Sequence, residues 1–205
     1  YDANYSWDLG DGYKVKTNVF YQKMRHLMSN TLMRAGGTMM MDAMNNRTEV
    51  EAGGIDLAID MPLYDGILTV GVNGDQSNHD ANSWMKDTSD GSGGAGTNME
   101  MDTNFFNGVE RDRYSVFTEW TGDIANNLVL DLGARYTHTW SDAGKVSTDS
   151  MMAMTVMDKN TFNAADRSRN FNEVDLAAVL RYAVSSELGV EVGLARKNRA
   201  PTYQE

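Results

Sequence analysis

Most of the 15 methionines fall in three segments of the chain. Methionine that fills gaps in a core would lie on apolar strand faces, whereas these residues fall where the sequence predicts loops. A thioether sulfur is a soft, neutral ligand that suits Cu(I) and does little for Mg²⁺ or Ca²⁺. The segments therefore predict a copper-collecting surface. The alternatives are compositional bias or a contact surface for another protein. These methionines are Met33, Met39, Met40, Met41 and Met44, then Met85, Met99 and Met101, then Met151, Met152, Met154 and Met157.

A second possible copper site is a histidine and two methionines at alternate positions. His26 and Met28 are separated by one residue, and Met24 lies two residues before His26. In a β-strand, residues at i and i+2 point to the same face, and imidazole binds copper in either oxidation state. The spacing predicts copper ligation by His26 and Met28 beside Met24. The alternative is that His26 is an ordinary polar residue.

The segment that carries this pair alternates between two kinds of side chain, as expected for a strand with one face in lipid and one in water. The face that suits lipid holds Tyr13, Val15, Thr17, Val19 and Tyr21. The face that suits water holds Lys14, Lys16, Asn18, Phe20, Gln22, Met24, His26 and Met28.

Similar alternation recurs along the chain. It is clearest from Leu128 to Tyr136, where apolar residues occupy every second position and an aromatic residue ends the stripe, as in a lipid-facing strand with an interfacial girdle. In the third predicted strand the apolar register slips by one residue at Gly53-Gly54. Such a slip would exchange the two faces unless an extra residue is accommodated, so we predict a β-bulge there.

The connections between predicted strands alternate in length. Tight turns at 10–12, 62–66, 122–127 and 184–187 alternate with long segments at 29–46, 77–110 and 141–170, and no helix of useful length competes. Outer-membrane β-barrels have short periplasmic turns and longer extracellular loops. We therefore predict an all-β protein, an antiparallel up-and-down meander of about eight strands. Residues 1–205 are expected to be a single section of a larger transmembrane barrel, without a plug domain or signal peptide; the alternative is a complete small barrel.

Composition limits the classes of partner. A net charge of −11 argues against nucleic-acid binding, which needs clustered Lys and Arg, and favours cations. Asp131, Arg135, Glu173, Asp175, Arg181 and Glu191 are interpreted as charged ladders that brace a wet barrel wall rather than as catalytic groups. We expect no enzymatic activity, since the sequence has no phosphate loop, nucleophile elbow or zinc-protease spacing. His79, placed in the second loop, and His138, on an apolar face, are expected to be structural or incidental.

Several segments resemble TonB-dependent outer-membrane receptors, and most closely their copper-receptor branch. The resemblance covers most of residues 111–205. It is carried by Arg113-Tyr114-Ser115-Val116-Phe117-Thr118-Glu119-Trp120, by Leu132-Gly133-Ala134-Arg135-Tyr136 with Ser141-Asp142-Ala143-Gly144, by Phe162-Asn163-Ala164-Ala165-Asp166-Arg167, and by Leu194-Ala195-Arg196-Lys197-Asn198-Arg199-Ala200-Pro201.

The resemblance implies a bacterial outer-membrane barrel of about twenty-two strands, in contact with outer-membrane lipid. It also implies an N-terminal plug domain, absent from this chain, through which an inner-membrane complex supplies energy. Receptors of the copper branch pair a barrel His-x-Met with a plug Cys-x-x-x-Met, and His26-Leu27-Met28 matches the first pair. The implied function is copper binding and uptake, with copper as transported ligand rather than catalytic cofactor. The alternatives are a receptor for a siderophore or other metal chelate, and a soluble all-β binding or adhesion module.

Overall fold

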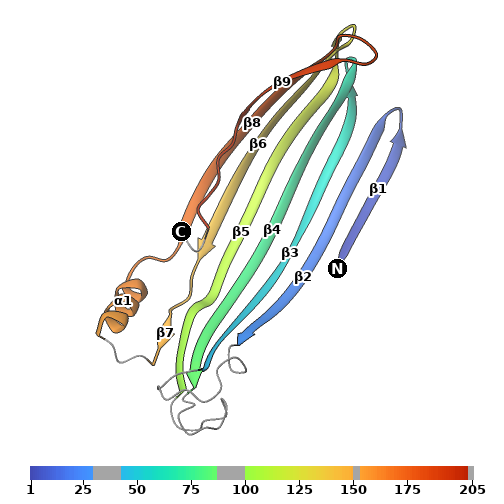
Figure 1. Cartoon of the computed structure of the whole chain (residues 1–205). Coiled ribbons are helices and arrows are strands. Elements are labelled where there is room, and N and C mark those ends of the chain that lie inside the picture. Colours follow the sequence, from blue (N-terminus) through green and yellow to red (C-terminus); the bar gives the residue numbers. More distant parts are fainter. Residues whose placement is uncertain (30–42, 87–99, 150–152, 203–205) are drawn as a thin grey trace.

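A computed structural model describes residues 1–29, 43–86, 100–149 and 153–202, and these form one long, curved sheet (Figure 1). The antiparallel strands follow one another in chain order from β1 at one edge to β9 at the other, and the short β7 pairs with β5. This confirms an all-β meander, with nine strands where about eight were predicted. The strands are β1 (Asp2–Gly10), β2 (Tyr13–Ser29), β3 (Ala43–Leu63), β4 (Gly66–Lys86), β5 (Glu100–Ala125), β6 (Leu128–Asp142), β7 (Ser147–Thr148), β8 (Arg169–Ala183) and β9 (Gly189–Arg196).

The prediction that no helix competes is wrong in one place. Helix α1 (Ala153–Ala164) lies in the connection between β7 and β8. Asn163 fastens it to the chain before β7, because its side chain donates to the Val146 carbonyl at 2.8 Å and accepts from the Val146 amide at 2.9 Å. Within the described residues, no helix combines the length and hydropathy needed to cross a bilayer.

The strand register places the predicted apolar residues on one face of the sheet. Residues directly opposite each other point the same way, and one such row runs through Val15, Ile59, Val70, Thr118, Ala134 and Leu176. The adjacent row, on the other face, runs through Lys16, Ala58, Gly71, Phe117, Arg135 and Asp175. The sheet therefore has an apolar face and a polar face, as the alternation predicted.

The apolar face is not covered by a second layer. Leu132 is 45% exposed and Leu180 is 39% exposed. Among the described residues, the buried apolar side chains are Ala81, Val109 and Ala200 alone. A soluble β-sandwich hides its apolar faces against each other, so this arrangement does not fit the sandwich alternative.

The bulge predicted at Gly53-Gly54 is absent. Gly53 pairs with Tyr21 and Gln76, and Gly54 pairs with Phe20 and Asp75, within an unbroken register on both sides of β3. The apolar face of β3 simply continues beyond Gly53 as Glu51, Glu49 and Arg47. The apparent slip in the sequence is therefore a change from apolar to charged residues on one face of a single continuous strand.

The central strands are longer than predicted and extend into the segments assigned to loops. β3, β4 and β5 have 21, 21 and 26 residues, whereas about 9–11 tilted residues cross a bilayer. As a result His79, predicted in a flexible loop, lies on β4. The position predicted for His138 is confirmed, because it follows Ala134 and Tyr136 on the apolar face and its Nδ1 lies 3.0 Å from Asn172 Oδ1.

The tight turns form where predicted and use left-handed backbone conformations. Gly10, Asp11 and Gly12 have φ values of 86°, 51° and 81° between β1 and β2, and Asn127 has φ of 61° between β5 and β6. Glycine and asparagine accept these values at little cost, so the hairpins close at the positions that the sequence predicts.

Gly71 leaves room for an aromatic side chain on the polar face. A Cβ at this position would overlap the ring of Phe117 and lie 2.8 Å from the Leu57 carbonyl oxygen. The Arg135 guanidinium lies 4.8 Å from the centre of the same ring, so the ring is held from both sides. Its displacement would also disturb that cation–π contact.

We expect Gly71→Ala to lower the free energy of unfolding by about 1–3 kcal/mol, the usual cost of overpacking. Gly133→Ala is the matched control, because it also lies on the polar face and its Cβ would meet no atom closer than 3.9 Å. That control should change stability by less than about 1 kcal/mol. Denaturant titration of both variants measures the difference, and equal stabilities would contradict the role of Gly71.

Candidate metal-binding site

β2 carries Met24, His26 and Met28 on the polar face of the sheet. Val15 and Val19 on the same strand point to the apolar face, and every even-numbered residue of this regularly paired strand points away from it. Directly opposite on β3 lie Val50, Thr48 and Asn46. The three potential copper ligands are therefore aligned near the end of β2 that leads into the first long connection.

These side chains are accessible. Met24 is 55% exposed and Met28 is 53% exposed, so neither sulfur is used to fill a core. Alternate positions on a strand lie about 6.6 Å apart, which allows an imidazole and a thioether to converge on one ion. Two such donors leave a coordination sphere incomplete, so further ligands must come from the opposite side of the metal.

The remaining predicted methionines lie in several places. Met154 is on α1, 73% exposed, and α1 lies beside β7 and the far end of β5, away from β2 (Figure 1). The structure does not bring Met154 to His26. The methionines of the predicted copper-collecting surface that lie outside the described residues are Met33, Met39, Met40, Met41, Met99, Met151 and Met152.

Met44, Met85 and Met101 were assigned to loops, and the structure places them in strands. Met44 on β3 is directly opposite Met85 on β4, which is directly opposite Met101 on β5. The sequence did not predict this alignment, because the strands were expected to end before these residues. The paired residues next to them show that β3, β4 and β5 continue into the segments assigned to loops.

His79, which was expected to be structural or incidental, is a further candidate ligand. It lies opposite Val50, which in turn lies opposite Met24, so all three share the polar face. Partial burial and the positive charge of Arg111 lower the pKa of His79. Its imidazole is therefore mainly neutral near pH 7, the form that ligates metals. Within the described ranges, no three His, Cys, Asp or Glu side chains gather to hold a metal.

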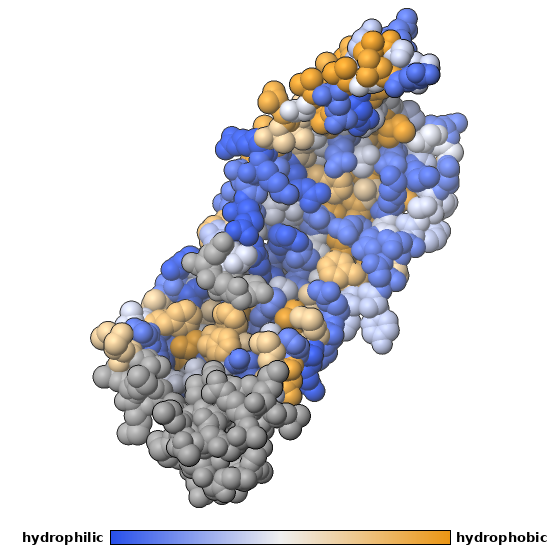
Figure 2. All heavy atoms as spheres, viewed as in Figure 1, coloured by the Kyte–Doolittle hydropathy of each residue, from blue (hydrophilic) through white to orange (hydrophobic). Residues whose placement is uncertain are grey.

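Ion pairs brace the same face nearer the tight turns, and three of the six residues predicted to form charged ladders take part in them. Of the other three, Arg135 stacks on Phe117, Glu173 accepts a hydrogen bond from Thr139, and Asp175 accepts one from the Asn198 amide. Arg181 pairs with Asp131 and lies 3.3 Å from Glu191, linking β8 to both neighbouring strands. Lys16 and Asp60 are 2.6 Å apart between β2 and β3. Figure 2 shows that hydrophilic residues dominate the middle of the visible face. Such cross-strand pairs are typical of a wall that contacts water.

A cavity of about 780 Å³ lies between the N-terminal end of β5, the chain around β7, and α1. Its apolar lining includes Phe105, Phe106, Phe162 and Phe171. Its charged lining is balanced, with three basic side chains (Lys159, Arg167 and Arg169) and three acidic ones (Asp142, Asp158 and Asp166). Arg167 is fixed by hydrogen bonds to the carbonyl oxygens of Ala143 and Asn163, both at 2.8 Å. The volume and lining suit an organic molecule rather than a bare ion.

A comparison with protein families agrees with the two-faced meander and the alternating connections, and its match covers the whole chain. The family model described as "TonB dependent receptor-like, beta-barrel" matches residues 1–205. The chain belongs to this family. Its members are outer-membrane proteins, so the apolar face contacts lipid, the polar face lines the barrel interior, and the strand ends opposite the tight turns lie on the extracellular side.

Among solved structures, the chain is similar to one titled "Copper transporter OprC", with a TM-score of 0.73 and 18% sequence identity. The match covers 98% of this chain and 30% of that one, so the chain spans less than a third of the length of this relative. No curated protein sequence matches significantly. At this identity the similarity establishes the fold, and it agrees with a barrel section.

Proposed function

We propose that the receptor of which this chain is a section takes up copper across the outer membrane, and that His26 and Met28 bind the ion inside the barrel. The observation that carries the proposal is the exposure of Met24 and Met28 on the interior face, on the same strand and side as His26. The structural similarity to a copper transporter supports the choice of metal.

The chemistry of this strand is suited to a soft ion. A thioether has no proton to lose and no charge, so it offers its sulfur to Cu(I) at any pH and competes poorly for hard cations such as Mg²⁺. The net charge of −11 favours the approach of cations in general. Selectivity would then come from sulfur and imidazole rather than from the overall charge.

Ligands that complete the site would come from the plug domain, which packs inside barrels of this family. Because a plug must move or rearrange for an ion to pass, sharing the metal between plug and wall would couple release to that movement. The energy would come from the inner-membrane complex that contacts the region before the plug.

Uptake by whole cells tests this function. Cells that express the complete receptor are expected to accumulate several-fold more radioactive copper than cells without it, and removal of the inner-membrane energising complex should abolish the difference. Zinc uptake is the control, because thioether ligands favour Cu(I). Copper accumulation that is independent of the receptor would contradict the proposal.

A second candidate function is uptake of an organic metal chelate, and the cavity beside α1 favours it. Its aromatic side chains provide stacking surfaces, and its basic and acidic side chains provide hydrogen-bonding groups of both signs, which suits an organic chelate with apolar and polar parts. In the same cells, receptor-dependent uptake of a ferric chelate without uptake of copper would support this candidate over the first.

A further inference from the structure

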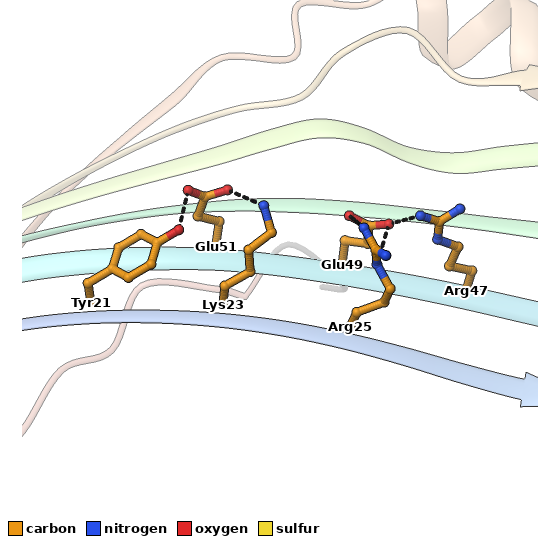
Figure 3. A network of polar contacts seen from close by, with 6 residues as sticks. All are labelled: Tyr21, Lys23, Arg25, Arg47, Glu49 and Glu51. Carbon is orange, nitrogen blue, oxygen red and sulfur yellow. Dashed lines mark hydrogen bonds and ion pairs between the residues drawn. The ribbon is translucent and has the colours of Figure 1, made fainter. Parts of the chain in front are cut away.

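An ion cluster lies on the outward-facing side of β2 and β3 (Figure 3). Tyr21 donates a hydrogen bond of 2.6 Å to Glu51, and Lys23 Nζ lies 3.2 Å from the other oxygen of that carboxylate. Arg25 Nε lies 3.0 Å from Glu49, which also pairs with Arg47. We call these six residues the outer-face ion cluster. It contains three cations and two carboxylates, a net charge of +1.

The register fixes the side on which the cluster lies. Lys23 and Glu51 are directly opposite each other, as are Arg25 and Glu49. Lys23 and Arg25 are an even number of residues from Val19, and Glu49 and Glu51 are an even number from Ile55, so all four point to the same side as these two residues. Val19 and Ile55 lie on the lipid-facing side. The cluster therefore faces away from the barrel interior and plays no part in the His26 site.

The height of the cluster follows from strand geometry. Tyr21 ends the apolar stripe of β2 on the extracellular side, the position where an aromatic girdle marks the edge of the hydrocarbon. At about 3.3 Å per residue and a tilt of about 40°, Lys23 lies about 5 Å and Arg25 about 10 Å above Tyr21. The headgroup layer on each side of a bilayer is about 5–8 Å thick. Lys23 is thus at the level of lipid headgroups and Arg25 lies just above them. Arg47, opposite Leu27, starts about 15 Å above Tyr21 by the same geometry, and its side chain extends back toward Glu49. The cluster therefore spans the headgroup layer and the space directly above it.

The cluster presents its charge to that layer. The side chains of Lys23, Arg25 and Arg47 are 54%, 62% and 44% exposed, so each keeps donors that Glu49 and Glu51 do not use. Hydrogen bonds from Tyr21 and Lys23 lower the pKa of Glu51, and those from Arg25 and then Arg47 lower that of Glu49. Both carboxylates are therefore ionised at neutral pH and hold the cations in place.

Stability alone does not explain three grouped cations in a chain of net charge −11. Exposed ion pairs contribute about 0–1 kcal/mol to folding. On the same outward side and at this height, the neighbouring strands carry Asn78 and Asp80 on β4 and Glu110 and Asp112 on β5, so among the described residues of β2–β5 the positive charge lies on the β2–β3 pair. Guanidinium groups bind phosphate oxygens in bidentate geometry.

We propose that the outer-face ion cluster binds the phosphate groups of a phosphorylated lipid in the outer leaflet. The acyl chains of this lipid lie against Val19, Ile55 and Leu57, and its phosphates lie between Lys23, Arg25 and Arg47. Tyr21 packs at the junction of the two parts. This contact anchors one side of the barrel in the membrane at a fixed depth.

The test measures lipid affinity of the complete receptor in detergent micelles, with fluorescent diphosphoryl lipid A as the probe. Lys23→Ala/Arg25→Ala/Arg47→Ala is expected to lower affinity by about 100-fold, at roughly fivefold for each cation near an anionic membrane surface. Lys14→Ala/Lys16→Ala is the matched control, since it removes positive charge from the interior face of the same strand, and it should leave affinity unchanged. Heat-dependent gel mobility confirms that each variant is folded.

A second variant changes the affinity in the opposite direction. Glu49→Gln/Glu51→Gln removes the competing carboxylates and raises the net charge of the cluster from +1 to +3, so lipid A should bind more tightly. Dephosphorylated lipid A should bind equally to all variants. Equal affinity of the wild type for both lipids, an equal loss in the Lys14/Lys16 control, or displacement of lipid A by millimolar inorganic phosphate would overturn the proposal.

Discussion

Replacing His26 and Met28 together by alanine is expected to weaken Cu(I) binding by the complete receptor by on the order of 100-fold or more. Partners outside the first ligand shell of a metal already contribute about 10- to 100-fold in affinity, and these two residues are proposed to contact the ion directly. Isothermal titration with Cu(I), held reduced and buffered by a competing chelator, measures the change.

Leu27→Ala is the matched control for this experiment. Leu27 lies between the two ligands, is 58% exposed and points to the opposite face of β2, so its truncation should leave copper affinity unchanged. Met24→Ala is expected to have a smaller effect than the double variant. Unchanged affinity after His26→Ala/Met28→Ala would remove the pair from the mechanism, while leaving the barrel and its orientation intact.

The second large effect is expected from two adjacent alanines on β8 that point to opposite faces. Ala178 lies in the lipid-facing row with Trp120, Leu132 and Leu194, in the middle of the apolar stripe. We expect Ala178→Arg to lower the free energy of unfolding in a bilayer by about 2–4 kcal/mol, because a guanidinium near the midplane loses its hydration.

Ala177→Arg is the control, because it makes the same alanine-to-arginine change at the adjacent position. Ala177 lies in the interior row, separated from Glu119 only by Gly133, so an arginine there has both water and a carboxylate within reach. Its effect should be below about 1 kcal/mol. Denaturant titration of the receptor in phospholipid vesicles measures both values. A larger loss for Ala177→Arg would mean that the two faces are assigned the wrong way round.

The faces of the sheet were predictable because each strand crosses from water to lipid with side chains alternating at every step. From Leu128 to Tyr136 the alternation is so regular that inspection of the sequence places each residue on the correct side. The Gly53-Gly54 region was misread for the same reason. Above the bilayer, the outward side no longer needs apolar residues, and Val50 and Ala52 on the interior side resembled a displaced apolar stripe.

The ends of the long strands were not predictable from hydropathy. Beyond the membrane both faces of β3, β4 and β5 contact water, so a polar stretch such as 77–84 in β4 has a loop-like composition even though it pairs without a break with β3 and, apart from an irregularity around Asp80, with β5. Pairing with a neighbouring strand depends on residues far away in the sequence, and no local pattern reports it. His79 was placed in a loop for this reason.

Part of the candidate site was predictable as well. The i, i+2 spacing of His26 and Met28 fixes a shared face wherever the segment is a strand, and the register confirms that geometry. Copper ligation by the pair stays a prediction. The alignment of Met44, Met85 and Met101 depends on three strands meeting in one register, which the spacing within any one segment does not reveal.

The length of β5 also determines what the cell presents to its surroundings. With 26 residues, this strand is more than twice as long as a crossing requires, and its neighbours rise beside it. The receptor therefore stands above the membrane as a stiff collar whose amide groups are already paired. Antibodies and proteases that approach this part of the wall meet backbone that is hydrogen-bonded in a sheet rather than an unpaired loop. We therefore expect the collar to resist cleavage on intact cells.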